Sequence, residues 1–287
     1  MQLLVLAILY YAVYVPSIVW NKQLDSVQIL PVYMVGGVLA YVVSGIWNYA
    51  VYSKSAILSG LINSVIMFAT VIAYAQHGAP IIVISGLMRF GVLTVSPVAD
   101  LVMGTRPSVL SIIALSIAGL AVVIMVGKDP WTAMPEISAE CIATYIALYF
   151  FRLLILKLAK RRGVESRGLS FIGAEQGVTV LSGILMVTAA CIYSAHIRKG
   201  YGLFDDYRAW GAGAFAQFAG VFGSMILLLP GSHTRNVTIN RIASIMAAVT
   251  AAAWVGQKIP VTHRVGVGFL ILAFVVLSFD KKKIELK

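Results

Sequence analysis

Charge is scarce in this chain, and negative charge is the scarcer kind. Only 11% of the 287 residues are charged, with 11 Asp and Glu against 22 Lys and Arg, whereas 60% are hydrophobic. The mean hydropathy is +0.91. A soluble domain of this length needs more polar residues to cover its surface, so the composition excludes a soluble globular protein. It predicts an all-α integral membrane protein.

Cysteine, histidine and catalytic motifs are also sparse. The two cysteines, Cys141 and Cys191, are too few for a disulfide framework or a metal site. No HxxxH, HExxH or DxxxD spacing occurs, and neither a P-loop nor a dinucleotide fingerprint is present. We therefore expect no metal, no cofactor and no enzymatic activity, and we expect transport to run on gradients or exchange. The histidines at loops or span ends are expected to be solvated: His77, His196, His233 and His263.

Apolar stretches close to the twenty residues that span a bilayer recur along the whole chain. The first has no basic region before it and no small-residue cleavage site after it, so we expect it to be retained. The stretches predict ten transmembrane helices, at 1–19, 27–51, 55–76, 79–103, 108–126, 137–158, 169–195, 209–230, 236–255 and 263–280.

Basic residues are distributed unequally between the predicted loops. If both termini are cytoplasmic, that side holds twelve basic residues, including the run from Lys157 to Arg167 and a basic C-terminal tail, against seven outside. The positive-inside rule then predicts a multipass protein of the cell (inner) membrane with both termini in the cytoplasm. The same rule accounts for the net charge of +11 without nucleic acid as a partner. Four tryptophans would lie at the outer interface: Trp20, Trp131, Trp210 and Trp254.

Two hairpins in the chain are related by a constant shift. The first, from Ile84 to Met125, joins an apolar helix to a second one through the turn TRPS. The shift that places Arg89 on Arg241 also places Gly104 on Gly256. This relation indicates two halves, 1–130 and 131–287. Because each half would contain five helices, the halves would insert in opposite orientations as two inverted five-helix repeats.

These hairpins also carry a family resemblance. The segment SPVADLVMG-TRPS followed by LSIAGLAVVIM resembles the fourth and fifth helices of the drug/metabolite transporter (DMT) superfamily, EamA-like, and WVGQKIPVTHRVGVGFLILAFVVL resembles the same pattern in the second half. The family has a Gly-Glu-Arg turn there, but this chain has Thr105 and Gln257 in place of Glu. Any role of that acid therefore does not carry over. The resemblance implies a ten-helix transporter that works by alternating access.

Ionised residues inside the predicted spans indicate the candidate site, because each costs at least ~2.5–3.5 kcal/mol at mid-bilayer unless it is partnered or wet. Arg89 and Arg241 are related by the repeat and lie about ten residues into their helices, so we expect both to face one central cavity. A guanidinium offers a planar fork to a carboxylate or phosphate, which predicts that the pair binds the negative group of a substrate. The alternative is that Arg89 pairs with a helix carbonyl or with an acid such as Asp100.

Other residues complete the predicted site. Arg152 and Glu175 lie at equal depth on consecutive helices, which predicts an ion pair that is either structural or, through Glu175, coupled to protons. Pro97 is expected to kink the fourth helix where a gate would need it. Further substrate contacts are expected from Asn63, Gln217, Tyr145 and Tyr149, with Asn48, Gln176 and Tyr33 as further candidates, although interhelical hydrogen bonds would explain them equally.

These features predict a secondary-active transporter of a small organic anion or metabolite, with that substrate and the lipid bilayer as its partners. Two alternatives stay open. One is a flippase of a lipid-linked, polyprenyl-phosphate substrate, and the other is a multipass membrane enzyme or scaffold. An exporter of cations or neutral drugs is opposed by the midplane arginines, and a homodimer is left open.

Overall fold

A computed structural model describes residues 2–24, 27–76, 80–127, 134–161, 168–230 and 232–279, and within these ranges every regular element is helical. The expected domain boundary at 130/131, the residues His77 and Trp131, and the basic segments at 162–167 and 281–287 lie outside them. The elements are α1 (Gln2–Leu24), η1 (Val27–Ile29), α2 (Leu30–Val43), η2 (Ile46–Tyr49), α3 (Lys54–Tyr74), α4 (Ile81–Val102), α5 (Val109–Val126), α6 (Glu136–Arg161), α7 (Gly168–Tyr193), α8 (Ala195–Arg198), η4 (Lys199–Leu203), α9 (Tyr207–Leu228), α10 (His233–Trp254) and α11 (Val261–Ser278).

Nine helices of the described part are long and apolar enough to cross a membrane: α1, α3, α4, α5, α6, α7, α9, α10 and α11. Their lengths run from 18 to 26 residues, which matches the thickness of a hydrocarbon core at 1.5 Å per residue. The prediction of an all-helical, multipass membrane protein is confirmed at this level.

The predicted span at 27–51 is not one long helix. Its α-helical part, α2, has only 14 residues, about 21 Å at 1.5 Å per residue. It is flanked by the 3-10 helices η1 and η2. Gly45 follows α2 with a φ of 66°, in the left-handed region that ends helices and that glycine adopts without strain. Hydropathy predicted the apolar segment but not this break, because the residues on both sides of Gly45 are equally apolar.

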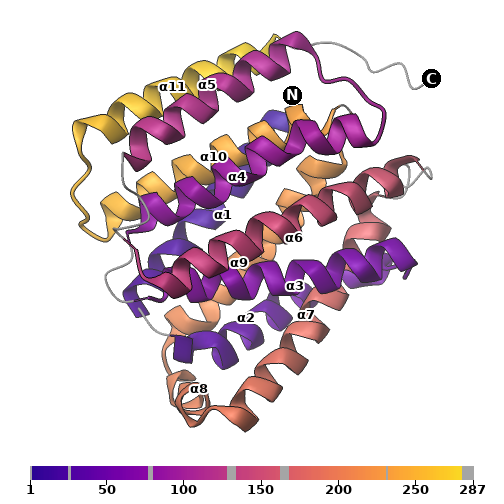
Figure 1. Cartoon of the computed structure of the whole chain (residues 1–287). Helices are drawn as coiled ribbons and strands as arrows, with labels where there is room; N and C mark the ends of the chain where they lie inside the picture. The colour runs from indigo at the N-terminus through magenta and orange to yellow at the C-terminus, as the bar shows by residue number, and fades with distance from the viewer. Residues whose placement is uncertain are drawn as a thin grey trace.

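Eight helices, the short α2 among them, pack as two groups of four, and each group takes helices from both halves of the sequence. In the first group α9 packs against α1 and α2, and α1 packs against α10; in the second, α3 packs against α6 and α7, and α6 packs against α4. The groups meet through α4 against α10 and α2 against α7. Figure 1 shows α5 and α11 side by side as an outer layer over α4 and α10.

The packing has the same pattern in both halves when their helices are matched in chain order. In this match α1, α2, α3, α4 and α5 correspond to α6, α7, α9, α10 and α11. Exchanging the corresponding helices converts the α1–α9 contact into α6–α3, the α2–α9 contact into α7–α3 and the α1–α10 contact into α6–α4. It maps the contacts α4–α10, α5–α11 and α2–α7 onto themselves. The two four-helix groups are therefore built to the same plan.

Glycines set the close contact between α2 and α9. A Cβ atom on Gly36 would lie 1.7 Å from the carbonyl oxygen of Trp210, and one on Gly213 would lie 1.8 Å from the carbonyl oxygen of Tyr33. Only glycine leaves room for two backbones at such distances. This contact holds α9 with its residues Gln217 to Gly223 toward the centre of the molecule.

Pro97 lies inside α4, which continues to Val102. Proline lacks the amide that would bond the carbonyl four residues earlier, and the Ser96 hydroxyl donates to that Leu93 carbonyl at 3.0 Å instead. Pro97 does not line the central cavity. A role for it in gating stays a prediction.

Candidate functional site

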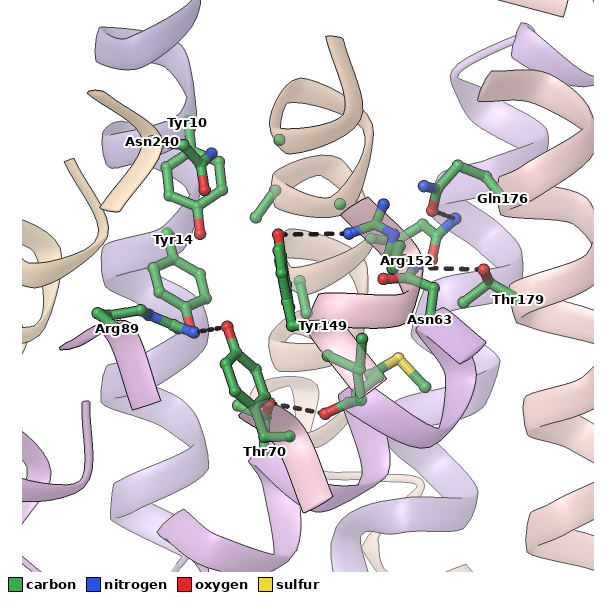
Figure 2. A pocket seen from close by; sticks show the side chains of 18 of the residues that line it. Tyr10, Tyr14, Asn63, Thr70, Arg89, Tyr149, Arg152, Gln176, Thr179 and Asn240 are labelled. Carbon is green, nitrogen blue, oxygen red and sulfur yellow. Dashed lines mark hydrogen bonds between the residues drawn. The ribbon is translucent and has the colours of Figure 1, made fainter. Parts of the chain in front are cut away.

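A cavity of about 100 Å³ lies between the two four-helix groups. All eight helices of these groups contribute to its wall, whereas α5 and α11 contribute none. Figure 2 shows Tyr149 near its centre, with Arg89 and Tyr14 on one side and Arg152, Asn63 and Gln176 on the other. The wall thus combines aromatic, guanidinium and amide groups in an otherwise apolar interior.

The cavity brings Arg89 of α4 together with Arg241 of α10, and both side chains are buried. The hydroxyl of Tyr145 accepts hydrogen bonds from both guanidiniums, from Arg89 Nη1 and from Arg241 Nη1, the latter at 2.7 Å. Arg89 also donates to the hydroxyl of Tyr14, and Arg241 donates to that of Tyr149. A single phenol oxygen therefore bridges the two arginines predicted from the repeat.

Aromatic faces surround these guanidiniums. The Arg241 guanidinium lies 4.5 Å from the Tyr149 ring centroid, and that of Arg89 lies 5.2 Å from the Tyr145 centroid. Such contacts stabilise a cation but carry no opposite net charge. Across the described ranges, neither arginine forms an ion pair with a carboxylate, and the Nε of each has no hydrogen-bond partner. The cavity therefore holds two buried guanidiniums that no carboxylate of the described residues pairs with.

Arg152 of α6 does have an acidic partner. Its Nη2 lies 3.0 Å from Glu175 Oε1, and its Nε donates to the same oxygen at 3.1 Å. Ser59 also donates to Glu175 Oε1, and Ser224 donates to Oε2 at 2.6 Å. Both carboxylate oxygens are thus hydrogen-bonded, and Glu175 balances the charge of Arg152.

The predicted amide residues Asn63, Gln176 and Gln217 lie along the cavity wall and bond to polar side chains of neighbouring helices. Gln217 donates to Gln176 at 3.0 Å, and Asn63 donates to the hydroxyl of Thr179 at 3.3 Å. These bonds join α9 to α7 and α3 to α7, as the interhelical alternative expected. Asn48, by contrast, is exposed in η2 and lies away from the cavity, so its place among the candidates was wrong.

Asp100 does not pair with Arg89. Its carboxylate instead forms a salt bridge with Lys157 of α6. It also accepts hydrogen bonds from the backbone amides of His233 and Thr234, the latter at 2.8 Å. It thereby caps the N-terminus of α10, where the helix dipole favours a negative charge. His233 is consequently buried against this network, and the expectation that it is a solvated histidine was wrong.

Sequence reasoning missed Tyr10, Tyr14 and Asn240 in the cavity wall. Tyr10 and Tyr14 are one helical turn apart on α1, as Tyr145 and Tyr149 are on α6. The signal was present in the sequence, because YYAVY at 10–14 matches YIALY at 145–149. Asn240 is buried, and neither atom of its amide has a partner in the described part of the chain.

Comparisons with known proteins add no relative, since no family model and no curated protein matches the chain. The resemblance to the DMT superfamily therefore stays a prediction. In the part of the chain that the structure describes, no group of three or more His, Cys, Asp or Glu side chains is arranged to hold a metal ion.

Proposed function

We propose that this chain is a secondary-active transporter of a small organic anion, and that Arg89 and Arg241 together bind the anionic group. The observation that carries the proposal is that two buried guanidiniums share the Tyr145 hydroxyl in one cavity and form no ion pair with a carboxylate of the described residues. Buried charges without a counter-charge are costly, so an anionic substrate that supplies one would bind there favourably. Gln217 and Asn63 then contact the remainder of the substrate.

Transport by alternating access is part of this proposal. Ten transmembrane helices, with α2 as the short one, form two inverted five-helix repeats of the kind found in the DMT superfamily. The exchange symmetry of the helix contacts supports the repeat, and so do the matched Tyr10–Tyr14 and Tyr145–Tyr149 pairs. In such a fold the two four-helix groups rock about the cavity and expose the arginines to each side in turn.

Both termini lie in the cytoplasm in this proposal, and the protein spans the cell (inner) membrane. The excess of Lys and Arg in the loops of that side supports the orientation. This orientation puts Trp20 near the end of α1, Trp210 at the start of α9 and Trp254 at the end of α10 at the outer interface.

A flippase of a lipid-linked, polyprenyl-phosphate substrate is the second candidate. Met67 and Thr70 on α3 and Ala216 on α9 line the cavity and are half-buried, so this stretch of the wall is not sealed. A substrate whose apolar tail stays in the bilayer while its phosphate binds the arginines would use such a wall.

A thermal-shift screen of the purified protein tests the proposal. Carboxylates, sulfonates and phosphate esters form the panel, with their neutral amides as controls. An anion present at a hundred times its dissociation constant should stabilise the protein by roughly 2.7 kcal/mol. The shift should disappear in Arg89→Ala and in Arg241→Ala but persist in Arg208→Ala, whose side chain pairs with Asp206 outside the cavity. If no anion shifts the wild-type protein more than its amide does, the proposal is refuted.

A further inference from the structure

The hydroxyls of Tyr145 and Tyr149 each lie between two guanidiniums. Tyr145 accepts from Arg89 and Arg241, and Tyr149 accepts from Arg241 and, at 3.4 Å, from Arg152 Nη1. Two donated hydrogen bonds use both lone pairs of a phenol oxygen. Within the described residues neither hydroxyl donates a hydrogen bond of its own. Each oxygen is therefore surrounded by donors, and its own proton has no acceptor.

Counting the fixed charges explains why this matters. The three arginines stay charged at any relevant pH, and Glu175 balances one of them. Neutral tyrosines would leave two positive charges in a buried cavity. The titratable and charged groups that face the pair come from α1, α3, α4, α6, α7 and α10, and they are Tyr10, Tyr14, Tyr74, Arg89, Arg152, Glu175 and Arg241. Glu175 is the single carboxylate among them.

We propose that the Tyr145–Tyr149 pair holds a single phenolate charge while the cavity contains no anion, and that the pair takes up a proton when an anionic group binds Arg89 and Arg241. This inference rests on the proposed function. The phenolate oxygen gains its proton from hydronium, or from a buffer acid, on the side from which the anion enters. One O–H bond breaks in that acid as the tyrosine O–H bond forms, and the acid is left as water or as its conjugate base. The anion then replaces the phenolate as the partner of the guanidiniums.

The exchange leaves the charge of the cavity unchanged for a singly charged anionic group, because one negative charge leaves the pair as another arrives. Such a site binds an anion and a proton together and releases them together, which couples anion movement to a proton gradient. The charge is assigned to the pair and not to one ring, since both oxygens accept hydrogen bonds from Arg241. Tyr14 is not included, because it accepts from Arg89 alone.

The near-ultraviolet difference spectrum between the wild type and Tyr145→Phe/Tyr149→Phe tests the charge state without any ligand. An ordinary tyrosine ionises near about pH 10, so a phenolate band at neutral pH identifies a perturbed one. We expect the band in the wild type and its loss in the double variant, with Tyr11→Phe and Tyr14→Phe keeping it. Tyr11 bonds to Thr250 at 2.9 Å and does not line the cavity. Phenylalanine keeps each ring in place, and gel filtration checks that the variants fold.

Calorimetry with acetate and sulfate, neither of which titrates near neutral pH, tests the coupling. Repeating the titration in buffers of different ionisation enthalpy gives the number of protons that the protein takes up on binding. The wild type should take up close to one proton for each acetate bound, and its phenolate band should disappear. A missing band in the anion-free protein overturns the inference whether or not an anion binds, and so does a band that persists while an anion binds. If the band is present but no anion binds at all, the proposed function fails and the coupling fails with it.

Discussion

The ion pair between Arg152 and Glu175 offers a quantitative test of the structure. Replacing Arg152 by Met keeps most of the side-chain length but leaves the Glu175 carboxylate buried without its cation. Replacing Glu175 by Gln leaves Arg152 buried without its anion. Either change should lower the free energy of unfolding by roughly 3–5 kcal/mol, the range for removing one partner of a buried pair.

The double variant should be far less destabilised than the sum of the two single variants. The two hydrogen bonds from Arg152 to Glu175 Oε1, at 3.0 and 3.1 Å, place the expected coupling near the upper end of the range of about 0.5–3 kcal/mol for contacting residues. Ser59 and Ser224 keep their hydroxyls for the substituted amide, which limits the residual cost.

Unfolding of the purified protein in mixed detergent micelles, followed by circular dichroism, measures all four states of the cycle. The partly exposed pair of Asp206 and Arg208 serves as the control, because solvent screens it and its coupling should be much smaller than that of the buried pair. A double variant that is no more stable than the worse single variant would show that the two residues do not stabilise each other, and the description of Glu175 as the counter-charge of Arg152 would be abandoned.

Three further predictions concern binding, packing and topology. Arg89→Lys keeps the positive charge but loses the bidentate geometry of the guanidinium, so anion uptake into proteoliposomes should fall partially. Arg89→Ala should nearly abolish uptake, and equal uptake by the two variants would contradict the bidentate role. Gly213→Ala forces a methyl group into the Tyr33 carbonyl and should cost about 1–3 kcal/mol by thermal unfolding, whereas Gly268→Ala, with nothing within 4 Å, should cost little. Cysteines introduced at Lys54 and Tyr201, in a background without Cys141 and Cys191, should be labelled by an impermeant reagent from opposite sides; labelling of Lys54→Cys in intact cells would reverse the orientation.

Charge and spacing allowed part of the candidate site to be predicted from the sequence. Arg89 and Arg241 were identifiable because an ionised side chain in an apolar span is costly, and the repeat suggested that they meet. The pairing of Arg152 with Glu175 followed from their equal depth. Tyr10 and Tyr14 were missed because tyrosines in an apolar helix are common, and their significance arises only from the match between YYAVY at 10–14 and YIALY at 145–149.

The order of helix packing could not be predicted in the same way. Hydropathy gives the spans but not their neighbours, and the contact of α2 with α9 depends on Gly36 and Gly213 meeting backbone atoms far away in the sequence. The break at Gly45 was hidden because hydropathy averages over side chains and does not register the φ of one residue. The fold class therefore follows from composition, whereas the assignment of a cavity wall requires the packing.

The network around Asp100 fastens three helices together at one end of the molecule. At one end this carboxylate ties α4 and α6 to the first turn of α10 through Lys157 and Thr234. If the halves are exchanged as proposed, the position equivalent to Asp100 holds Ala252, which carries no charge. If the protein alternates between two open states as proposed, opening at the Asp100 end must separate this buried ion pair, and that cost lowers the population of the state open there. The contribution of Asp100 to the conformational equilibrium would thus have no counterpart at position 252.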